Sequence, residues 1–195
     1  MDIILASTSK IRRNVLINAG IKFSVVDSDI NETAAKAKMR ELSVEKTARE
    51  LAKLKSIKVS GQFPDAMVIG ADQILGFQNK IFNKPASRAE AEIQLLKLRG
   101  NMHTLYSAIS CAVAGSEIWS HCSEAHLTMR NFTPEFLSAY LNNSQESYLT
   151  SVGGYKLEES GIQLFDKIDG DYFAILGLPL LPLLGFLRQQ EIAQP

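Results

Sequence analysis

The residues best suited to chemistry lie in the apolar stretch 67–75, which carries a single carboxylate, Asp72, followed by the amide Gln73. The apolar residues on both sides predict a buried strand, where an unpaired carboxylate is energetically costly. Asp72 therefore either caps a turn or pairs with a nearby lysine, or it serves as a general base or metal ligand. Lys84, which precedes Pro85, is the cation we expect to face it.

A second candidate region is the turn after residues 3–6, which read as a short buried strand. Apolar residues then recur at helical spacing from residue 11 to residue 19, and Ser7 or Ser9 is suited to cap this helix. Arg12 and Arg13 would lie in its first turn, where the helix dipole disfavours cations. A bound phosphate would resolve the conflict by accepting hydrogen bonds from both. The alternative is an ordinary capped helix with solvated arginines.

Other polar clusters give weaker signals. Most side chains of the acidic segment 27–33 are expected to cap turns, although one carboxylate there could join a Mg²⁺ site shared with substrate phosphates. A helix is predicted at 44–59 with Leu51, Leu54 and Val59 on its apolar side. Its lysines, Lys46, Lys53, Lys55 and Lys58, suggest a solvated face, from which one lysine could point into a cleft. The three histidines and Cys122 fit no compact zinc pattern.

The remaining elements complete an α/β pattern. We predict a hairpin at 76–82 with its turn at Gln78 and Asn79, a helix that is capped by Ser87 and runs to about residue 98, and strands at 102–113 and 117–127. The apolar face of this helix is expected to contain Ala91, Ile93, Leu95, Leu96 and Leu98. A helix opening at 133–135, a strand at 163–168 and a last helix from 178 to about 190 follow. The glycine-rich segment 151–158 is either a further site or a close backbone contact. The order predicts a mixed twisted sheet flanked by helices, with ligands at the strand ends.

Composition narrows the class of protein. The chain has 195 residues, 46% of them hydrophobic and 22% charged, which suits one folded domain spanning 1–195. Lys+Arg and Asp+Glu are both 21, so no overall positive field favours nucleic acid. Two cysteines make no disulfide framework, and the start of the chain lacks a signal-peptide pattern. The apolar run 175–187 is short for a bilayer and contains prolines, so we expect no membrane span.

Taken together in this order, the motifs resemble the Maf (septum formation) family of nucleoside triphosphate pyrophosphatases. The resemblance covers nearly the whole chain and implies a cytoplasmic enzyme that depends on Mg²⁺ or Mn²⁺ and is often a homodimer. It also implies an inosine-triphosphatase-like body with two lobes and a central cleft. The matching segments are Ala6-Ser7-Thr8-Ser9 with Arg12-Arg13, Asn31-Glu32-Thr33, Leu51-Ala52 with Lys55, Gly70-Ala71-Asp72-Gln73, Lys84-Pro85, Gly100 with His103, and Gly177-Leu178-Pro179-Leu180.

By position, the resemblance assigns roles to individual residues. Asp72 would accept a proton from the attacking water, and Glu32 and Asp72 would hold the metal. The phosphates would be bound by Ser9, Arg13, Lys55 and Lys84, and Arg12 joins this set from its place in the first helical turn. General base catalysis and neutralisation of phosphate charge both agree with these residue types.

Three further positions, Ile11, Gln73 and Glu158, correspond to those at which branches of the family differ in substrate. Gln73 and Glu158 resemble the branch acting on 7-methyl-GTP rather than the dTTP/UTP branch, and a carboxylate suits the N1–H and N2–H₂ edge of guanine. Ile11 stands where that branch has an aromatic residue, so stacking on the cationic methylated base is lost. Alternative functions are a nucleotide-binding regulator of septation with little catalysis, or an inosine or xanthosine triphosphatase. A housecleaning role and a link to division arrest also follow from the resemblance.

Overall fold

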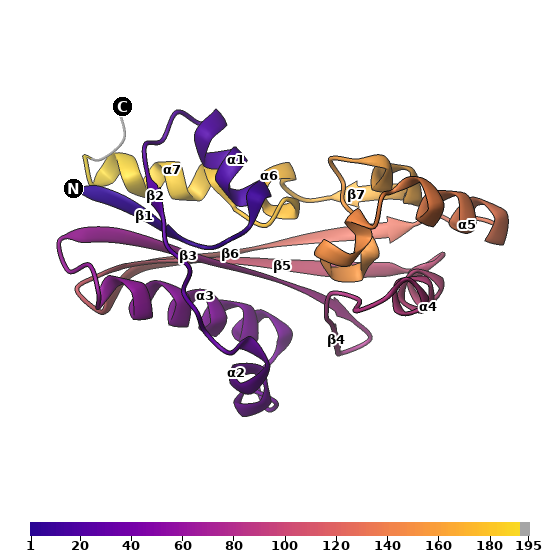
Figure 1. Ribbon diagram of the computed structural model, residues 1–195, viewed down its shortest axis with the longest axis horizontal. Coiled ribbons are helices and arrows are strands. Elements are labelled where there is room, and N and C mark those ends of the chain that lie inside the picture. Colours follow the sequence, from indigo (N-terminus) through magenta and orange to yellow (C-terminus); the bar gives the residue numbers. More distant parts are fainter. Residues whose placement is uncertain (192–195) are drawn as a thin grey trace. The chain divides into compact units, whose positions relative to one another are not determined.

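The computed structural model describes residues 1–191 and has a mixed α/β fold (Figure 1). In chain order the strands are β1 (Asp2–Ala6), β2 (Ser24–Val25), β3 (Ala66–Phe77), β4 (Lys80–Phe82), β5 (Met102–Val113), β6 (Ser116–Met129) and β7 (Phe165–Asp169). They form one seven-stranded sheet in the order β2-β1-β3-β5-β6-β7, with β4 paired to β3. β1 is parallel to β2 and β3, whereas β4 and β7 run antiparallel to their partners, so the predicted mixed sheet is confirmed.

Helices flank this sheet, as predicted. They are α1 (Lys10–Asn18), α2 (Glu32–Lys38), α3 (Val44–Ser60), α4 (Arg88–Leu98), α5 (Pro134–Asn143), α6 (Tyr172–Ile175) and α7 (Leu180–Gln189). Three short 3₁₀ segments lie between α5 and β7, namely η1 (Ser147–Thr150), η2 (Val152–Gly154) and η3 (Ser160–Leu164). Within residues 1–191, no helix combines the length and the apolar character that a membrane crossing would need.

The chain divides into two compact units. Unit 1 contains residues 1–73, 107–123 and the described residues from 171 onward, and unit 2 contains 74–106 and 124–170. β3, β5 and β6 each pass from one unit into the other. Two units agree with the two lobes that the resemblance implies. The cleft between lobes and the treatment of 1–195 as a single domain stay predictions.

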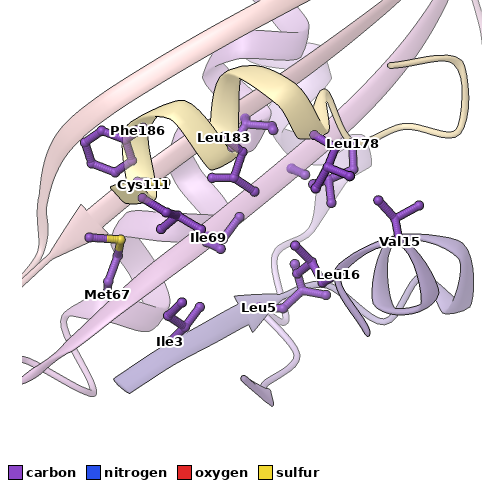
Figure 2. Packing of buried hydrophobic residues seen from close by; sticks show 14 residues of the cluster. Ile3, Leu5, Val15, Leu16, Met67, Ile69, Cys111, Leu178, Leu183 and Phe186 are labelled. Atoms are coloured by element: carbon purple, nitrogen blue, oxygen red, sulfur yellow. The ribbon is translucent and has the colours of Figure 1, made fainter. Parts of the chain in front are cut away.

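The core of unit 1 follows from the alternation of β1. Ile3 and Leu5 pair with Met67 and Ile69 of β3, and all four side chains pack under α1 and α7 (Figures 1 and 2). The alternate residues of the same strands pack on the opposite face, where α3 contributes Val59. Because successive side chains of a strand point to opposite faces, β1 and β3 are covered by helices on both sides.

Gly70 of β3 lets α3 lie directly on the sheet. A Cβ atom there would come within 2.3 Å of the Ala52 carbonyl oxygen and 2.7 Å of the Ser56 nitrogen. A larger residue would therefore push α3 away from β3. The close approach matters because Lys55 and Asp72 lie on these two elements.

In unit 2, two glycines of η2 pack closely against neighbouring side chains. Gly153 has φ +76°, and a Cβ there would lie 2.6 Å from Leu75 Cδ1. Gly154 packs on α4, against Ala91 and Leu95. Of the two interpretations of segment 151–158, the close backbone contact therefore describes the glycine pair.

Several predicted details are wrong for identifiable reasons. On α4 the predicted face is confirmed for Ala91, Leu95 and Leu98, which are buried, whereas Ile93 and Leu96 are 53% and 43% exposed and the polar Gln94 is buried. The face follows the helical angle, and the hydrophobicity of single residues misled the prediction. Leu54 of α3 is likewise exposed. The short helices α2 and α6 were not predicted, because neither is long enough to show a periodic pattern.

Candidate functional site

The turn between β1 and α1 is built by two serines. Ser9 is the N-cap of α1, and its Oγ accepts a hydrogen bond from the Arg12 backbone nitrogen at 3.4 Å. Ser7 is buried, and its Oγ accepts from the Ser9 nitrogen at 3.3 Å. The predicted cap is therefore confirmed for Ser9. Ser7 stabilises the same turn through its hydrogen bond with the Ser9 nitrogen.

Arg12 is bound by the protein itself. Its Nη1 donates to the Ala71 carbonyl at 2.9 Å and to Ser7 Oγ at 3.3 Å, and its Nε donates to the Gly177 carbonyl at 2.8 Å. Burial lowers the pKa of the guanidinium, and the negative charges of Asp72 and Glu32 oppose that effect. The interpretation of a solvated arginine is wrong for Arg12. No spacing in the sequence indicates its contact with Gly177, which is 165 residues away.

Arg13 differs from its neighbour. It is exposed, and its side chain lines a shallow hollow of unit 1 together with Ile17 and Lys22. Ile11, two residues earlier, is half-buried and packs on the apolar cluster beneath α1 and α7. The three neighbouring candidates of the first helical turn thus have three different environments.

The central charged cluster of unit 1 consists of Lys55, Asp72 and Glu32. Lys55 Nζ lies 2.6 Å from Asp72 Oδ1 and 2.7 Å from Glu32 Oε1. Lys55 and Asp72 are buried, at 7% and 5% exposure, whereas Glu32 is half-exposed at the start of α2. The predicted pairing of Asp72 with a nearby lysine is confirmed, and the lysine is Lys55. It is also the one predicted surface lysine of α3 that is buried.

One oxygen of Asp72 is left for a ligand. Within residues 1–191, the buried side-chain nitrogens and oxygens without a hydrogen-bond partner are Gln94 Oε1 and His103 Nδ1. Asp72 Oδ2 is not among them and makes no hydrogen bond within these residues. It therefore has contact with solvent, while Oδ1 is held by Lys55.

The same carboxylates suit a magnesium-like ion. Because both contact Lys55 Nζ, their oxygens lie at most about 5.3 Å apart, the sum of the two distances. Two ligands of one Mg²⁺ ion lie up to about 4.2 Å apart, so a small movement would let both oxygens reach it. No group of three or more His, Cys, Asp or Glu side chains within residues 1–191 is arranged to hold a metal. A pair of carboxylates nevertheless fits Mg²⁺, which commonly takes its other ligands from water and substrate phosphates.

Gln73 is held on the other side of β3. Its Nε2 donates to Ser107 Oγ at 2.9 Å, to the Ile175 carbonyl at 2.9 Å and to the Ala174 carbonyl at 3.1 Å. Sequence reasoning singled out Gln73 but missed Ser107, a buried residue of an apolar strand.

Two predicted site residues belong to unit 2. Lys84 is exposed and precedes the buried Pro85, and Gln94 of α4 fixes the segment by donating to the Asn83 carbonyl at 3.2 Å. Glu158 is exposed in a turn closed by the ion pair of Lys156 and Glu159. The expectation that Lys84 faces Asp72 stays a prediction.

The histidines make separate local contacts. His103 Nε2 lies 2.7 Å from the Tyr155 hydroxyl, His126 Nδ1 lies 3.1 Å from Thr104 Oγ1, and His121 Nε2 lies 3.1 Å from Ser123 Oγ. Each ring is thus engaged with a hydroxyl group of its own surroundings.

Comparison with known proteins extends over the whole chain. A family model described as Maf-like protein matches residues 2–190. A protein of Granulibacter bethesdensis named nucleoside triphosphate pyrophosphatase is 46% identical over 193 residues, which cover 98% of each chain. Proteins named 7-methyl-GTP pyrophosphatase are 47% identical in Brucella suis, over 98% of this chain and 97% of the relative, and 44% identical in Rhizobium etli, over 96% and 95%. The match of the family model and these full-length similarities show that the chain belongs to the Maf family.

Proposed function

We propose that this protein is a nucleoside triphosphate pyrophosphatase, which hydrolyses a nucleoside triphosphate to the monophosphate and pyrophosphate. Membership of the Maf family and the names of its full-length relatives support this activity. The observation that carries the proposal is Asp72, a buried carboxylate with one oxygen on Lys55 and the other accessible to a ligand.

Asp72 is the proposed general base. Water attacks the α-phosphorus, Asp72 Oδ2 takes the proton of that water, and the bond from the α-phosphorus to the bridging oxygen breaks to release pyrophosphate. Lys55 holds Oδ1 at 2.6 Å and so fixes the orientation of the carboxylate. A positioned base of this kind contributes roughly 10²–10⁴-fold to the rate.

Cationic and hydroxyl groups are proposed to bind the phosphates. In unit 1 these are Ser9 at the start of α1, the exposed Arg13 and Lys55, and in unit 2 Lys84. Arg12 already donates from Nε and Nη1 to the protein, so its Nη2 is the nitrogen with which it would reach a phosphate. Charge-assisted hydrogen bonds of this type suit the oxygens of a triphosphate.

Glu32 and Asp72 are proposed to hold a divalent cation, Mg²⁺ or Mn²⁺. When bound, such an ion neutralises charge that develops on the phosphate oxygens. Lys55 lies between the two carboxylates, so its ammonium group is expected to move toward the phosphates as the cation is taken up.

We propose that the choice of nucleobase in the substrate depends on Ile11, Gln73 and Glu158. The relatives named 7-methyl-GTP pyrophosphatase make 7-methyl-GTP the first nucleotide to test. The half-buried Ile11 supplies an apolar surface but no ring for stacking. We further propose a homodimeric cytoplasmic protein with a housecleaning role, which links to division arrest through the nucleotide pool.

A panel of triphosphates with Mg²⁺ or Mn²⁺, assayed for pyrophosphate, tests the proposal. We expect pyrophosphate and monophosphate in equal amounts from at least one guanine-type nucleotide, and no product after chelation of the metal. Nucleotide binding without pyrophosphate from any member of the panel would contradict the proposal and favour a binding regulator. A strong preference for ITP or XTP would instead indicate an inosine or xanthosine triphosphatase.

A further inference from the structure

The carboxamide of Gln73 is held with one end toward the protein. All three acceptors near its Nε2 belong to unit 1, namely Ser107 Oγ of β5 and the carbonyl oxygens of Ala174 and Ile175 in α6. The opposite orientation would place Oε1 against two carbonyl oxygens and lose these hydrogen bonds. The amide nitrogen therefore faces the protein.

Ser107 favours this orientation of the Gln73 carboxamide over the opposite one. Its hydroxyl proton goes to the Ala174 carbonyl, 2.6 Å away, so its oxygen meets Gln73 with a lone pair. Ser107 is 1% exposed, and water is therefore not available to replace the hydroxyl. A lone pair requires a donor, and Nε2 is the only donor that the Gln73 side chain has.

The acceptors in α6 are themselves fixed at both ends. Asp171 is the N-cap of α6, and its Oδ1 accepts from the Ala174 nitrogen at 2.8 Å. Beyond α6, Arg12 Nε donates to the Gly177 carbonyl at 2.8 Å. The segment that orients Gln73 is therefore tied to α1, and its carbonyl groups cannot easily turn away.

The other end of the carboxamide is accessible. Gln73 is half-buried, and its Oε1 makes no hydrogen bond within residues 1–191. It is also not among the buried atoms that lack a partner in this part of the chain. Oε1 therefore reaches solvent, and a ligand there would meet a hydrogen-bond acceptor without a competing donor.

Gln73 also lies beyond the end of the neighbouring strand β1. The pairing of β1 with β3 ends at Ala6 and Gly70, so Asp72 and Gln73 lie beyond the end of β1. Consecutive strand residues point to opposite faces, and Asp72 contacts Lys55 of α3 whereas Gln73 contacts α6. A triphosphate at Asp72 and a base at Gln73 would thus lie on the two sides of β3.

We infer that Ser107 is a positioning residue that presents Gln73 Oε1 as a hydrogen-bond acceptor, so that the base subsite selects a nucleobase with N–H donors. Guanine offers N1–H and N2–H₂ on this edge, whereas unsubstituted purine offers only ring-nitrogen acceptors and C–H groups. The inference rests on the proposed function and adds the side of the base that is recognised and the residue that enforces it.

The first test compares Ser107→Ala with Ser110→Ala. Both serines are buried on β5, but Ser110 bonds to Ser56 and Glu117 and has no contact with Gln73. We expect Ser107→Ala to lower the ratio of kcat/KM for GTP to kcat/KM for purine riboside triphosphate, whose base has no N–H donor, about tenfold, the effect of one hydrogen bond, and Ser110→Ala to leave it unchanged. In a Gln73→Ala background, Ser107→Ala should have no further effect on the ratio. An unchanged ratio in Ser107→Ala, or an equal fall in Ser110→Ala, overturns the inference.

A second measurement does not depend on activity. In the nucleotide-free protein, the side-chain NH₂ of Gln73 should show slowed hydrogen exchange by NMR, both in the wild type and in Ser110→Ala. Ser107→Ala should restore fast exchange. If no nucleotide is hydrolysed but this difference is found, the proposed function fails and the positioning of Gln73 stands. If hydrolysis is found but the exchange is fast in the wild type, the inference fails and the proposed function stands. Should Ser107→Ala not fold, Ser107→Cys, whose sulfur is a weak acceptor for Gln73 Nε2, is expected to lower the same ratio, and an unchanged ratio overturns the inference.

Discussion

The buried pair of Lys55 and Asp72 in unit 1 is charged, whereas the buried pair of His103 and Tyr155 in unit 2 is neutral. In unit 1, Lys55 contacts Asp72 and Glu32 at 2.6 and 2.7 Å. In unit 2, His103 contacts the Tyr155 hydroxyl at 2.7 Å, burial lowers the pKa of His103 to about 4, and burial raises the pKa of Tyr155. At neutral pH both members of the second pair therefore carry no charge.

We propose that this difference separates a ligand-binding cluster in unit 1 from a pair that serves packing in unit 2. Charges removed from water are stable only when they are compensated. In unit 1, Lys55 compensates two carboxylates. A bound cation could replace it there, and phosphates could then pair with its ammonium group. The neutral pair leaves His103 Nδ1 without a partner, but packs tightly against Phe165 and beside the glycines of η2. Changes in the first cluster should act on catalysis, and changes in the second on stability.

Among changes that test this comparison, the largest effect is expected from Asp72→Asn. We expect kcat to fall about 10³-fold, because the amide cannot take a proton from water. The fold should persist, since Lys55 keeps Glu32 as its counterion. Pyrophosphate release measures the rate, and nucleotide binding without metal should be largely kept. The exposed Asp65→Asn, just before β3, is the matched control and should keep full turnover. Turnover retained in Asp72→Asn would remove Asp72 as the base.

The neutral pair predicts a pH dependence of stability. The pKa of His103 is lowered from 6.5 to about 4, so the unfolded chain binds more protons between these values. The free energy of unfolding is therefore highest above pH 6.5 and decreases as the pH falls toward 4, by up to ~3 kcal/mol. Urea unfolding of the wild type and of His103→Gln at pH 7.5 and 4.5 measures it. The advantage of the wild type should shrink at pH 4.5, and an advantage independent of pH would contradict the prediction.

Crowding beside the neutral pair gives the next effect. Gly153 and Gly100 both have positive φ, +76° and +70°, but a Cβ at Gly153 meets Leu75 at 2.6 Å and Tyr155 at 2.8 Å, while one at Gly100 meets no atom within 4 Å. Gly100→Ala should cost about 1 kcal/mol from backbone strain alone. Gly153→Ala should cost about 2 kcal/mol more because of overpacking. Thermal or urea unfolding checks this, and equal losses in both variants would show that Leu75 and Tyr155 yield without cost.

Local patterns were sufficient for much of the fold. Runs of apolar residues predicted β1 and β3, the capping serines Ser9 and Ser87 predicted the starts of α1 and α4, and the turn residues Gln78 and Asn79 predicted a hairpin. These features depend on neighbours in the sequence, which is why single-sequence reasoning finds them.

The site was predictable only in part. Asp72 and Lys55 were recognised by residue type and by resemblance, but their direct contact depends on Gly70, which lets α3 approach β3. Arg12 and Ser107 owe their surroundings to partners 165 and 67 residues away. Contacts of this length are set by topology and leave no periodic signal.

Arg13 lies exposed beside the bound Arg12 and gives the smallest expected effect on stability. Arg13→Ala removes an exposed side chain and should change the free energy of unfolding by less than about 0.5 kcal/mol. Arg12→Ala removes three hydrogen bonds from a buried guanidinium and should cost about 2–3 kcal/mol. If Arg13 binds phosphate, its loss should raise KM severalfold at low salt with little change in kcat, because a screened surface charge contributes mainly to binding. Urea unfolding and steady-state kinetics at two salt concentrations measure both effects. A loss of stability in Arg13→Ala equal to that in Arg12→Ala would show that the Arg13 side chain is bound by the protein as that of Arg12 is, and would remove the distinction between these neighbours.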